Sequence, residues 1–585
     1  MEEKLLKSRH SLAHILAMAV LKMFPEAKLG TGPAIDNGFY YDFLLPRTLI
    51  PEDLPLIEEH MREIIKEGKP FEMYMEDIDS AIKFLDVAGQ PFKVEVATDL
   101  KNKEGVKEVS FYKTGEHFVD LCEGPHVENT RYIDAGSFML DKTAGAYFRG
   151  DETRPMMQRI YGLAFESKAE LKEFLKNREE AKKRDHRVLG SQLKIFTSSP
   201  LVGAGLPLLQ PNGMIIRMEL EKYLWELHKD NGYQRVWTPH IAKVSLYETS
   251  GHAAKFGDEL FRVKGKEEDF ILKPMNCPHH MQIFTDNAFS YRDMPIRYFE
   301  PATVYRDEKS GQLGGLTRVR SITQDDGHLF CRVDQINQEV KVIVGIIKEF
   351  YKTMGLLDDY WVRLSVRGTD KSEYLGSDEV WNKAEGALEE AAKQEKLPYT
   401  RVEGEAAFYG PKLDFMFKDC LGREWQLATI QCDFNLPERF DLSYTNEQGE
   451  KERPVVIHRA ISGSIERFMG VMIEHFAGAF PLWLAPMQIS ILPVAEPHEE
   501  FARDLMKQMK TLDIRANVVS SEMDSLGKRI RGCEIMKVPM MVVIGDKEIE
   551  EKTITVRDFA TKEQVTLKTE AFLKDVIEKI KGRVL

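Results

Sequence analysis

The sequence predicts a multidomain α+β protein, and three observations lead to this prediction. A chain of 585 residues is too long for one hydrophobic core, so we expect about three or four domains. Strand-like and helical segments are mixed in residues 1–165 and again in residues 189–485. In residues 486–585 the runs ISILPV, RANVVS and MMVVIG alternate with helical stretches, which indicates a small α/β domain with a parallel-type sheet.

The composition excludes several classes of protein. Hydrophobic residues make up 43% and charged residues 30%, which suits soluble globular domains, and no apolar run approaches the ~18 residues of a membrane span. The charged start MEEKLLKSRHSLAH lacks a signal-peptide core, and six cysteines without CxxC are no disulfide framework. We therefore expect a cytoplasmic protein without a membrane partner. The net charge of −13 argues against indiscriminate binding to nucleic acid, although the KRIR cluster near the C-terminus suits a polyanion.

The first domain contains two pairs of histidine and cysteine residues. His10 and His14 in HSLAH lie four apart, so a helix places both on one face, while Cys122 and His126 lie in the loop-like DLCEGPH. A lone HxxxH is more often two polar helix positions, but the second pair favours a site. Two chemistries remain open: a zinc set, or clustered imidazoles that position a water, with Cys122 as a polar or nucleophilic neighbour.

Two helices are expected around the first domain boundary. Residues 166–188 have dense charges with helical apolar spacing, which predicts an exposed linker helix. The stretch MIIRMELEKYLWELHKDNG predicts an amphipathic helix with Gly232 as its C-cap.

The stretch SITQDDGHLFC reads as a strand that carries polar side chains. Alternation puts four side chains on one face and turns Thr323 and Asp325 the other way; the four are Ile322, Gln324, Asp326 and His328. A solvated strand end is the alternative explanation for Asp325 and Asp326. Gly327 suggests no special role.

Further polar residues lie on a hairpin and a strand-to-helix turn. Arg306 and Glu308 follow the strand-like IRYFEPATVYRD, and the glycine-rich KSGQLGGLTRVR then predicts an antiparallel hairpin with a long mobile loop. Arginine suits phosphate because its planar fork donates two bonds, and a glutamate can accept from an exocyclic amine. In VVIHRAISGSIERFMG a strand runs into a helix, and the small Gly463 and Ser464 before Arg467 allow a ligand to approach the backbone.

In this order the segments resemble the motifs of class II aminoacyl-tRNA synthetases: a motif 1 helix ending at Pro239 in VWTPH, motif 2 in FEPATVYRDE to TQDDGH, and motif 3 in HRAISGSIERF. More narrowly, NCPHH, TQDDGHLFC, AFYGPKLDF, WQLATIQCDF and VIHRA are similar to the threonyl-tRNA synthetase family, and HSLAH and DLCEGPH to its editing domain. The resemblance covers nearly the whole chain. It implies an editing domain in residues 1–165, an antiparallel-sheet catalytic domain in 189–485 and an anticodon-binding domain in 486–585. The chain begins too close to HSLAH for the family's N-terminal ubiquitin-like domain.

The resemblance implies a catalytic zinc and a threonine pocket. The family's zinc ligands match Cys277, His328 and His458, so we expect one Zn²⁺ per subunit with an open position for substrate. Asp326 would accept the threonine hydroxyl proton. The threonine-binding positions are Gln324, Asp326, Tyr409 and Gln431.

The resemblance also implies a site for ATP with Mg²⁺. Its positions are Arg306, Glu308, Arg318, Ile322, Gln426 and Arg467, and the catalytic residues are Arg306, Lys412 and Arg467. Arg306 would contact the α-phosphate and Glu308 the adenine amine, with Arg318 and Arg467 on the terminal phosphate and over the adenine. Ile322 departs from the family, which usually has an aromatic residue stacking on adenine. Gln426 and Gln431 are five apart, so both reach one pocket only if the strand has a bulge.

For the outer domains the resemblance implies two further sites. The editing residues, which would act without metal, are His10, His14, Lys93, Asp120, Cys122 and His126, and the anticodon readers are Glu548 and Arg557. The implied function is a homodimeric enzyme that activates threonine with ATP, transfers it to tRNA(Thr) and hydrolyses mischarged seryl-tRNA(Thr). Two rivals are a non-catalytic regulator that senses threonine or uncharged tRNA, and a stand-alone hydrolase of aminoacyl esters.

Overall fold

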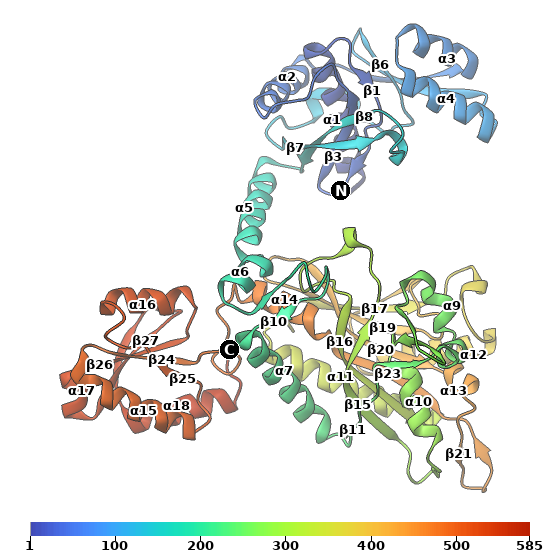
Figure 1. Ribbon diagram of the computed structural model, residues 1–585. Coiled ribbons are helices and arrows are strands. Elements are labelled where there is room, and N and C mark those ends of the chain that lie inside the picture. The colour runs from blue at the N-terminus through green and yellow to red at the C-terminus, as the bar shows by residue number, and fades with distance from the viewer. Residues whose placement is uncertain (1) are drawn as a thin grey trace. The chain divides into compact units, whose positions relative to one another are not determined.

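The computed structural model describes residues 2–585, and the chain divides into two compact units. The first unit ends at Glu180 and the second begins at Ala181. Figure 1 shows the helices and strands of the chain, coloured from the N-terminus to the C-terminus. Within the described residues, every helix is either too short or too polar to cross a membrane.

The first unit is an α+β structure with two antiparallel sheets. The larger sheet has the order β1-β3-β8-β7, with β2 on β3; the strands are β1 (Lys28–Leu29), β2 (Ala34–Ile35), β3 (Gly38–Leu44), β7 (Phe138–Tyr147) and β8 (Met156–Ala164). Helices α1 (Glu2–Met23) and α2 (Asp53–Glu67) pack on it. On α1, Leu12, Ile15, Leu16 and Ala19 recur at helical spacing and are fully buried, so this helix forms the centre of the core.

The smaller sheet of the first unit lies after α2 in the chain. Its order is β4-β5-β6, with β4 (Phe71–Asp77), β5 (Glu108–Thr114) and β6 (Phe118–Leu121), and it is covered by α3 (Ile78–Val87) and α4 (Pro91–Glu104). The loop after β6 carries Cys122 and His126, as the sequence indicates.

The predicted linker helix consists of two helices. They are α5 (Lys168–Arg184) and α6 (His186–Gln192), so the expectation of one helix over residues 166–188 is wrong. Asp185 interrupts the helix because its side chain accepts a hydrogen bond from the Arg187 N–H and starts α6 as an N-cap.

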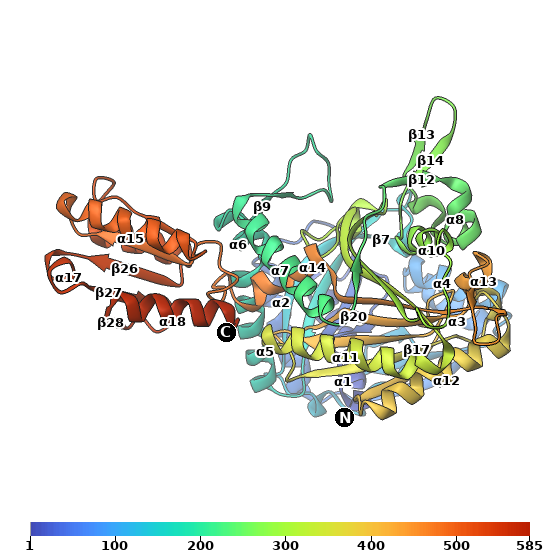
Figure 2. The same ribbon diagram turned by 90° about the horizontal axis from the view of Figure 1, so that it is seen from below.

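The second unit is built on an eight-stranded sheet with the order β11-β15-β16-β23-β20-β19-β17-β18. The strands are β11 (Gln234–Arg235), β15 (Ile296–Tyr305), β16 (Ser321–Cys331), β17 (Tyr360–Val366), β18 (Tyr399–Glu403), β19 (Lys412–Lys418), β20 (Glu424–Asp433) and β23 (Val455–Ser464). Only the outermost pairs, β11–β15 and β17–β18, are parallel, so the predicted mainly antiparallel core is confirmed. Helices α11 (Ile336–Thr353) and α12 (Asp378–Gln394) lie side by side along one face (Figure 2).

Shorter elements surround this sheet. They are α7 (Pro211–Lys229), α8 (Val244–Ser250), α9 (His252–Phe256), α10 (Cys277–Thr285), α13 (Asn435–Arg439), α14 (Ile465–His475), β9 (Phe196–Thr197), β10 (Leu208–Leu209), β12 (Ile241–Lys243), β13 (Arg262–Lys264), β14 (Asp269–Leu272), β21 (Tyr444–Thr445) and β22 (Lys451–Glu452). The helix expected to end at Pro239 is α7, and it ends at Lys229. Gly232, expected as its C-cap, lies beyond the C-cap Asp230 with φ of 75°, and the left-handed turn there leads the chain into β11 instead.

The C-terminal part of the second unit contains a five-stranded sheet with the order β25-β24-β26-β27-β28. The strands are β24 (Ile489–Pro493), β25 (Ala516–Val518), β26 (Met540–Ile544), β27 (Thr553–Asp558) and β28 (Gln564–Lys568), and the helices are α15 (Glu499–Thr511), α16 (Leu526–Ile535), α17 (Asp546–Glu551) and α18 (Thr569–Lys581). The first three strands are parallel, but β27 and β28 pair antiparallel, so the expectation of a parallel-type sheet holds for part of it. The connection between β26 and β27 contains only α17, which makes it too short for the crossover that a parallel pair needs, so β27 pairs antiparallel with β26.

Candidate functional site

The central strand β16 presents the predicted row of side chains to a cavity of about 350 Å³. Ile322, Gln324, Asp326 and His328 all line this cavity, which confirms that they share one face. Asp325 points the other way and is 0% exposed, with its carboxylate accepting bonds from the Ile461 N–H at 2.7 Å and the Ser462 hydroxyl at 2.9 Å. A solvated strand end is therefore wrong for both aspartates.

Behind the row lies a buried ion pair that the sequence analysis missed. The Arg459 Nη1 donates to the Asp325 backbone oxygen at 2.6 Å and lies 3.4 Å from its carboxylate. Burial raises the pKa of Asp325 to about 6, although Arg459 acts to lower it. A Cβ at Gly327 would lie 2.4 Å from Arg459 Cζ, so only glycine lets the guanidinium pass beside β16. The expectation that Gly327 has no special role is thus wrong.

Three predicted metal ligands meet beside the part of the cavity that His328 and His458 line. Cys277 begins α10, while His328 and His458 are directly opposite each other on the paired strands β16 and β23. One ligand atom from each residue lies within 4.8 Å of the others, and all three side chains are buried. A thiolate with two imidazoles is a donor set that suits zinc with one position left open.

Hydrogen bonds orient both imidazoles of this set. His458 Nε2 lies 2.9 Å from Asp433 Oδ2, and His328 Nδ1 lies 2.8 Å from His280 Nδ1. His280 in turn contacts Glu300 at 3.1 Å. These contacts leave His458 Nδ1 and His328 Nε2 for a metal, so the residues present fit the ion. In the sequence, the only sign of these supporting residues is His280, the second histidine of NCPHH.

The predicted threonine residues surround the same end of the cavity. The Tyr409 hydroxyl donates to Gln431 Oε1 at 2.6 Å, and Gln324 and Asp326 project from β16. Burial raises the pKa of Asp326 above its ordinary value. Both Gln426 and Gln431 line the cavity, and the pairing of β19 with β20 shifts register between them, which confirms the predicted bulge.

The predicted ATP residues all line the same cavity. Among the described residues, the buried Nε of Arg306 has no hydrogen-bond partner, while Arg318 and Glu308 form an ion pair of 2.6 Å. The Arg467 Nε donates to the Thr317 backbone oxygen at 2.9 Å. A buried guanidinium with a free donor is costly unless an anion joins it, so the cavity is suited to phosphate.

Ile322 and Lys412 complete the set of predicted residues. Ile322 lines the cavity and gives it an apolar wall. Lys412 is in register with Gln431 on the neighbouring strand, and its ammonium lies 2.9 Å from the buried Asp414. Lys412 is thus held by a carboxylate on the strand next to Gln431, and it is not among the residues that line the cavity.

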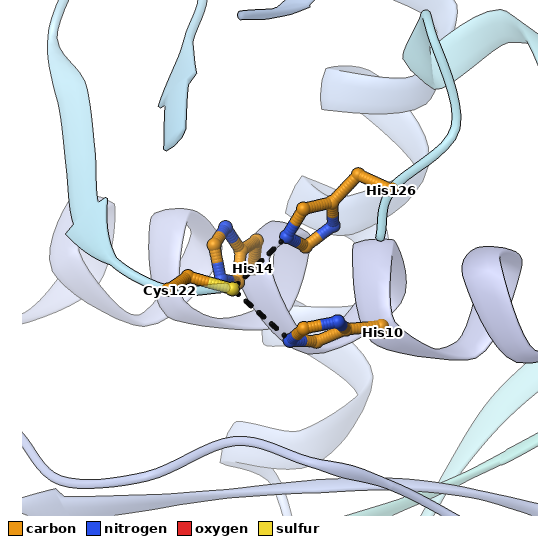
Figure 3. Close-up of side chains that lie close together, drawn as sticks. All are labelled: His10, His14, Cys122 and His126. Carbon is orange, nitrogen blue, oxygen red and sulfur yellow. Dashed lines mark hydrogen bonds between the residues drawn. The ribbon is translucent and has the colours of Figure 1, made fainter. Parts of the chain in front are cut away.

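The second histidine cluster lies in the first unit, beside a separate cavity of about 660 Å³. His10 and His14 come from α1, and Cys122 and His126 from the loop after β6 (Figure 3). The Cys122 sulfur lies between two imidazoles, 3.3 Å from His10 Nε2 and 3.3 Å from His126 Nε2. Burial raises the pKa of Cys122 to about 11, so at neutral pH the residue is a thiol that donates to a ring nitrogen.

A charged group lies next to this cluster. Lys93 and Asp120 form a buried ion pair of 2.7 Å, the Tyr41 hydroxyl donates to Asp120 at 2.5 Å, and His14 Nε2 is 3.7 Å from the same carboxylate. Burial lowers the pKa values of His10 and His14, so both rings are neutral at pH 7. All six predicted editing residues are therefore brought together, and Tyr41 joins them without a signal in the sequence.

Of the two predicted anticodon residues, Glu548 lies on helix α17 and Arg557 on strand β27, and these two elements contact each other. The Glu548 carboxylate accepts from the Gly545 N–H at 3.0 Å and from the Thr555 hydroxyl at 2.8 Å. Arg557 on β27 pairs with Glu534 at 3.1 Å, and its buried Nε has no partner among the described residues.

Comparison with known proteins agrees with this arrangement. Residues 109–161 match the threonyl and alanyl tRNA synthetase second additional domain, residues 261–476 the tRNA synthetase class II core domain (G, H, P, S and T), and residues 488–579 an anticodon binding domain. A threonine–tRNA ligase from Gloeobacter violaceus is 49% identical over 95% of this chain and 89% of its own length. The chain belongs to the threonine–tRNA ligase family.

Other relatives support this membership. A threonine–tRNA ligase from Thermus thermophilus is 46% identical over 99% of this chain and 89% of its own. A crystal structure titled as the RNA binding domain of threonyl-tRNA synthetase from Cryptosporidium parvum matches with a TM-score of 0.64 and 35% identity, covering 67% of this chain and 97% of that one. The predicted family, fold class and enzyme class are confirmed.

Proposed function

We propose that the protein joins L-threonine to the 3′ end of tRNA(Thr) and hydrolyses mischarged seryl-tRNA(Thr). Residues 189–485 would carry out synthesis, residues 1–165 editing and residues 486–585 anticodon binding. The observation that carries the proposal is one cavity lined both by His328 and His458, which form a set with Cys277, and by Arg306, Arg318 and Arg467. Metal ligands that suit an amino alcohol and arginines that suit phosphate are what activation of threonine by ATP requires.

The part of the cavity beside His328 and His458 would select threonine. Zinc bound by Cys277, His328 and His458 would supply an open coordination position for the amino and hydroxyl groups of the substrate. Asp326 would accept the hydroxyl proton, and Tyr409 with Gln431 and Gln324 would close the pocket. Valine lacks the hydroxyl and would leave the buried Asp326 unpaired, so it is rejected strongly.

The part of the cavity lined by Arg306, Arg318 and Arg467 would bind ATP with Mg²⁺. Arg306 would stabilise the charge that develops on the α-phosphate while the threonine carboxylate attacks it and diphosphate leaves. A hydroxyl of the terminal tRNA ribose then attacks the carbonyl carbon, and AMP leaves. Glu308 would accept from the adenine amine, with Gln426 and Ile322 along the nucleotide. Lys412 would act from the strand next to Gln431. Arg318 and Arg467 would hold the remaining phosphates and the adenine face.

The first unit would remove serine that escapes selection. Serine keeps the hydroxyl and loses one methyl, which is worth only ~1–3 kcal/mol of discrimination, so a second, hydrolytic site is needed. The neutral rings of His10 and His14, with His126 and the Cys122 thiol, would position a water without a metal. Lys93 and Asp120 form the charged wall beside them.

We further propose that Glu548 and Arg557 read unstacked anticodon bases. The protein would work in the cytoplasm as a homodimer. Apolar side chains around the motif 1 segment support the dimer: Leu201 is 98%, Trp237 74% and Met218 58% exposed. Exposed apolar side chains that form a patch mark an interaction surface, and these three fall within one short part of the sequence. The partner surface would be the same segment of a second copy.

Threonine-dependent exchange of diphosphate with ATP tests the proposal. The parent should catalyse exchange with threonine, and Arg306→Ala should lower the rate by a factor on the order of 10²–10³, the scale for losing one donor to transition-state charge. Absence of exchange in the parent would favour a non-catalytic regulator or a stand-alone hydrolase. A near-normal rate in Arg306→Ala would remove Arg306 from the catalytic role.

A further inference from the structure

The buried His186 links the end of the linker to two elements of the ATP site: helix α14, which carries Arg467, and the loop that carries Arg318. His186 is the first residue of α6 and is 5% exposed. Its Nδ1 lies 2.6 Å from Glu474 Oε1 near the end of α14, and its backbone N–H donates to the same oxygen at 3.0 Å. Its Nε2 accepts a hydrogen bond of 3.0 Å from the Leu316 N–H in the motif 2 loop.

These contacts determine the protonation of the ring. Because the Leu316 N–H is a donor, Nε2 must be the unprotonated nitrogen, and the ring proton lies on Nδ1 facing the Glu474 carboxylate. Glu474 is itself held by an ion pair with Arg423. His186 is therefore a neutral bridge between a fixed carboxylate and a backbone N–H of the loop.

The part of the loop that His186 holds carries the phosphate residues. Leu316 is fully buried, and the next residue, Thr317, accepts the Arg467 Nε hydrogen bond through its backbone oxygen at 2.9 Å. Arg318 follows directly and projects into the cavity in its ion pair with Glu308. A shift of Leu316 would therefore displace the Thr317 oxygen that binds Arg467, and it would also displace the backbone of Arg318.

Two glycines allow the close approach of the bridge. A Cβ at Gly315, where φ is 59°, would lie 2.3 Å from His186 Nε2. A Cβ at Gly470 on α14 would lie 3.3 Å from both Leu316 Cβ and Thr317 Cγ2. The loop is thus packed against His186 and α14 with no space for side chains between them.

We propose that His186 is a positioning residue of the ATP site, which holds Leu316 and so keeps Arg318 and Arg467 directed at the phosphates. The inference rests on the proposed role of these arginines in binding ATP. His186 does not contact the threonine end of the cavity, since its contacts are to Glu474, the loop and Phe196. It should therefore affect ATP and threonine differently, which a residue that merely stabilises the fold would not do.

The test compares three variants of the full-length protein in threonine-dependent ATP–diphosphate exchange. His186→Ala removes the acceptor for the Leu316 N–H and should raise KM for ATP about tenfold, which corresponds to ~1.4 kcal/mol. KM for threonine and the bound-metal content should stay within about twofold of the parent. His186→Gln, whose amide oxygen reaches the position of Nε2, should restore KM for ATP, whereas the shorter His186→Asn keeps only a donor to Glu474 and should not.

Each outcome decides the inference. The inference is overturned if folded His186→Ala has a KM for ATP within about twofold of the parent, or if its KM values for ATP and for threonine rise equally. In either case, threonine-dependent exchange by the parent still upholds the proposed function. If His186→Ala does not fold, the two amide variants decide, and an Asn variant as good as the Gln variant overturns the inference. A parent without threonine-dependent exchange would overturn the proposed function and this inference with it.

Discussion

The two histidine–cysteine clusters have similar ligand spacing but differ in what surrounds their rings. In each, the ligand atoms lie within 4.8 Å of one another. Around the Cys277 set, His458 is bonded to Asp433 and His328 to His280, so each ring keeps one nitrogen for a metal. In the first unit the outer partner of His126 is the Ser11 hydroxyl, 3.1 Å from its Nδ1, and the Nε2 atoms of His10 and His126 lie against the Cys122 sulfur.

This difference teaches that distance between ligands does not by itself identify a metal site. A carboxylate behind an imidazole fixes the ring and raises its basicity, and Asp433 and Glu300 supply such groups only to the catalytic cluster. In the first unit Asp120 is occupied by Lys93 and Tyr41 and lies 3.7 Å from His14. This difference supports the proposal that the Cys277 cluster holds a metal and that the His10 cluster positions a water.

Replacement of Asp326 should give the largest change in selectivity. A site built to bond a substrate hydroxyl rejects an analogue without it by a factor on the order of 10⁴–10⁵, so Asp326→Ala should lower discrimination of threonine over valine by a factor on the order of 10³. The measurement is kcat/KM for exchange with each amino acid. The control is Asp307→Ala, an exposed aspartate on the same hairpin. Unchanged rejection of valine would show that Asp326 does not read the hydroxyl.

Loss of the second cluster should change accuracy but not activation. The double variant His10→Ala with His14→Ala should keep normal threonine exchange and accumulate seryl-tRNA(Thr), because one methyl gives a selectivity of only about 10–200-fold at the first site. His117→Ala, an exposed histidine of the same unit, is the control. A folded double variant that clears seryl-tRNA at the parent rate would contradict the editing role.

Removal of an outer carboxylate should have a smaller effect, confined to metal affinity. Asp433→Asn should weaken zinc binding about 10–100-fold, the scale for losing the hydrogen-bond partner of a ligand histidine. Asp120→Asn, the matched change beside the other cluster, should leave zinc affinity as in the parent. Competition with a chelator measures both. Equal weakening in the two variants would mean that the outer layers do not distinguish the clusters.

Much of the site could be predicted from the sequence because its residues fall in short motifs. Strand alternation was enough to group Ile322, Gln324, Asp326 and His328, and the five-residue spacing of Gln426 and Gln431 required a bulge. The grouping of Cys277, His328 and His458 rested on family resemblance, since they lie far apart in the chain.

The rest depended on long-range packing that no local pattern records. Asp325 looked like a solvated strand end, but Arg459 reaches it across the sheet and requires glycine at position 327. His186 looked like part of a charged linker, yet the cap at Asp185 turns it into the core. The antiparallel pairing of β27 and β28 depends on the short connections before these strands, which the apolar runs do not reveal.

The zinc content of three purified proteins tests the central claim that only one cluster holds a metal. The parent should contain about one zinc per chain, Cys277→Ser should lose it, and Cys122→Ser, the same substitution in the other cluster, should keep it. Mass spectrometry of the metal under native conditions, with circular dichroism to confirm folding, makes the measurement. Two zinc ions per parent chain, or loss of zinc from a folded Cys122→Ser variant, would contradict the account.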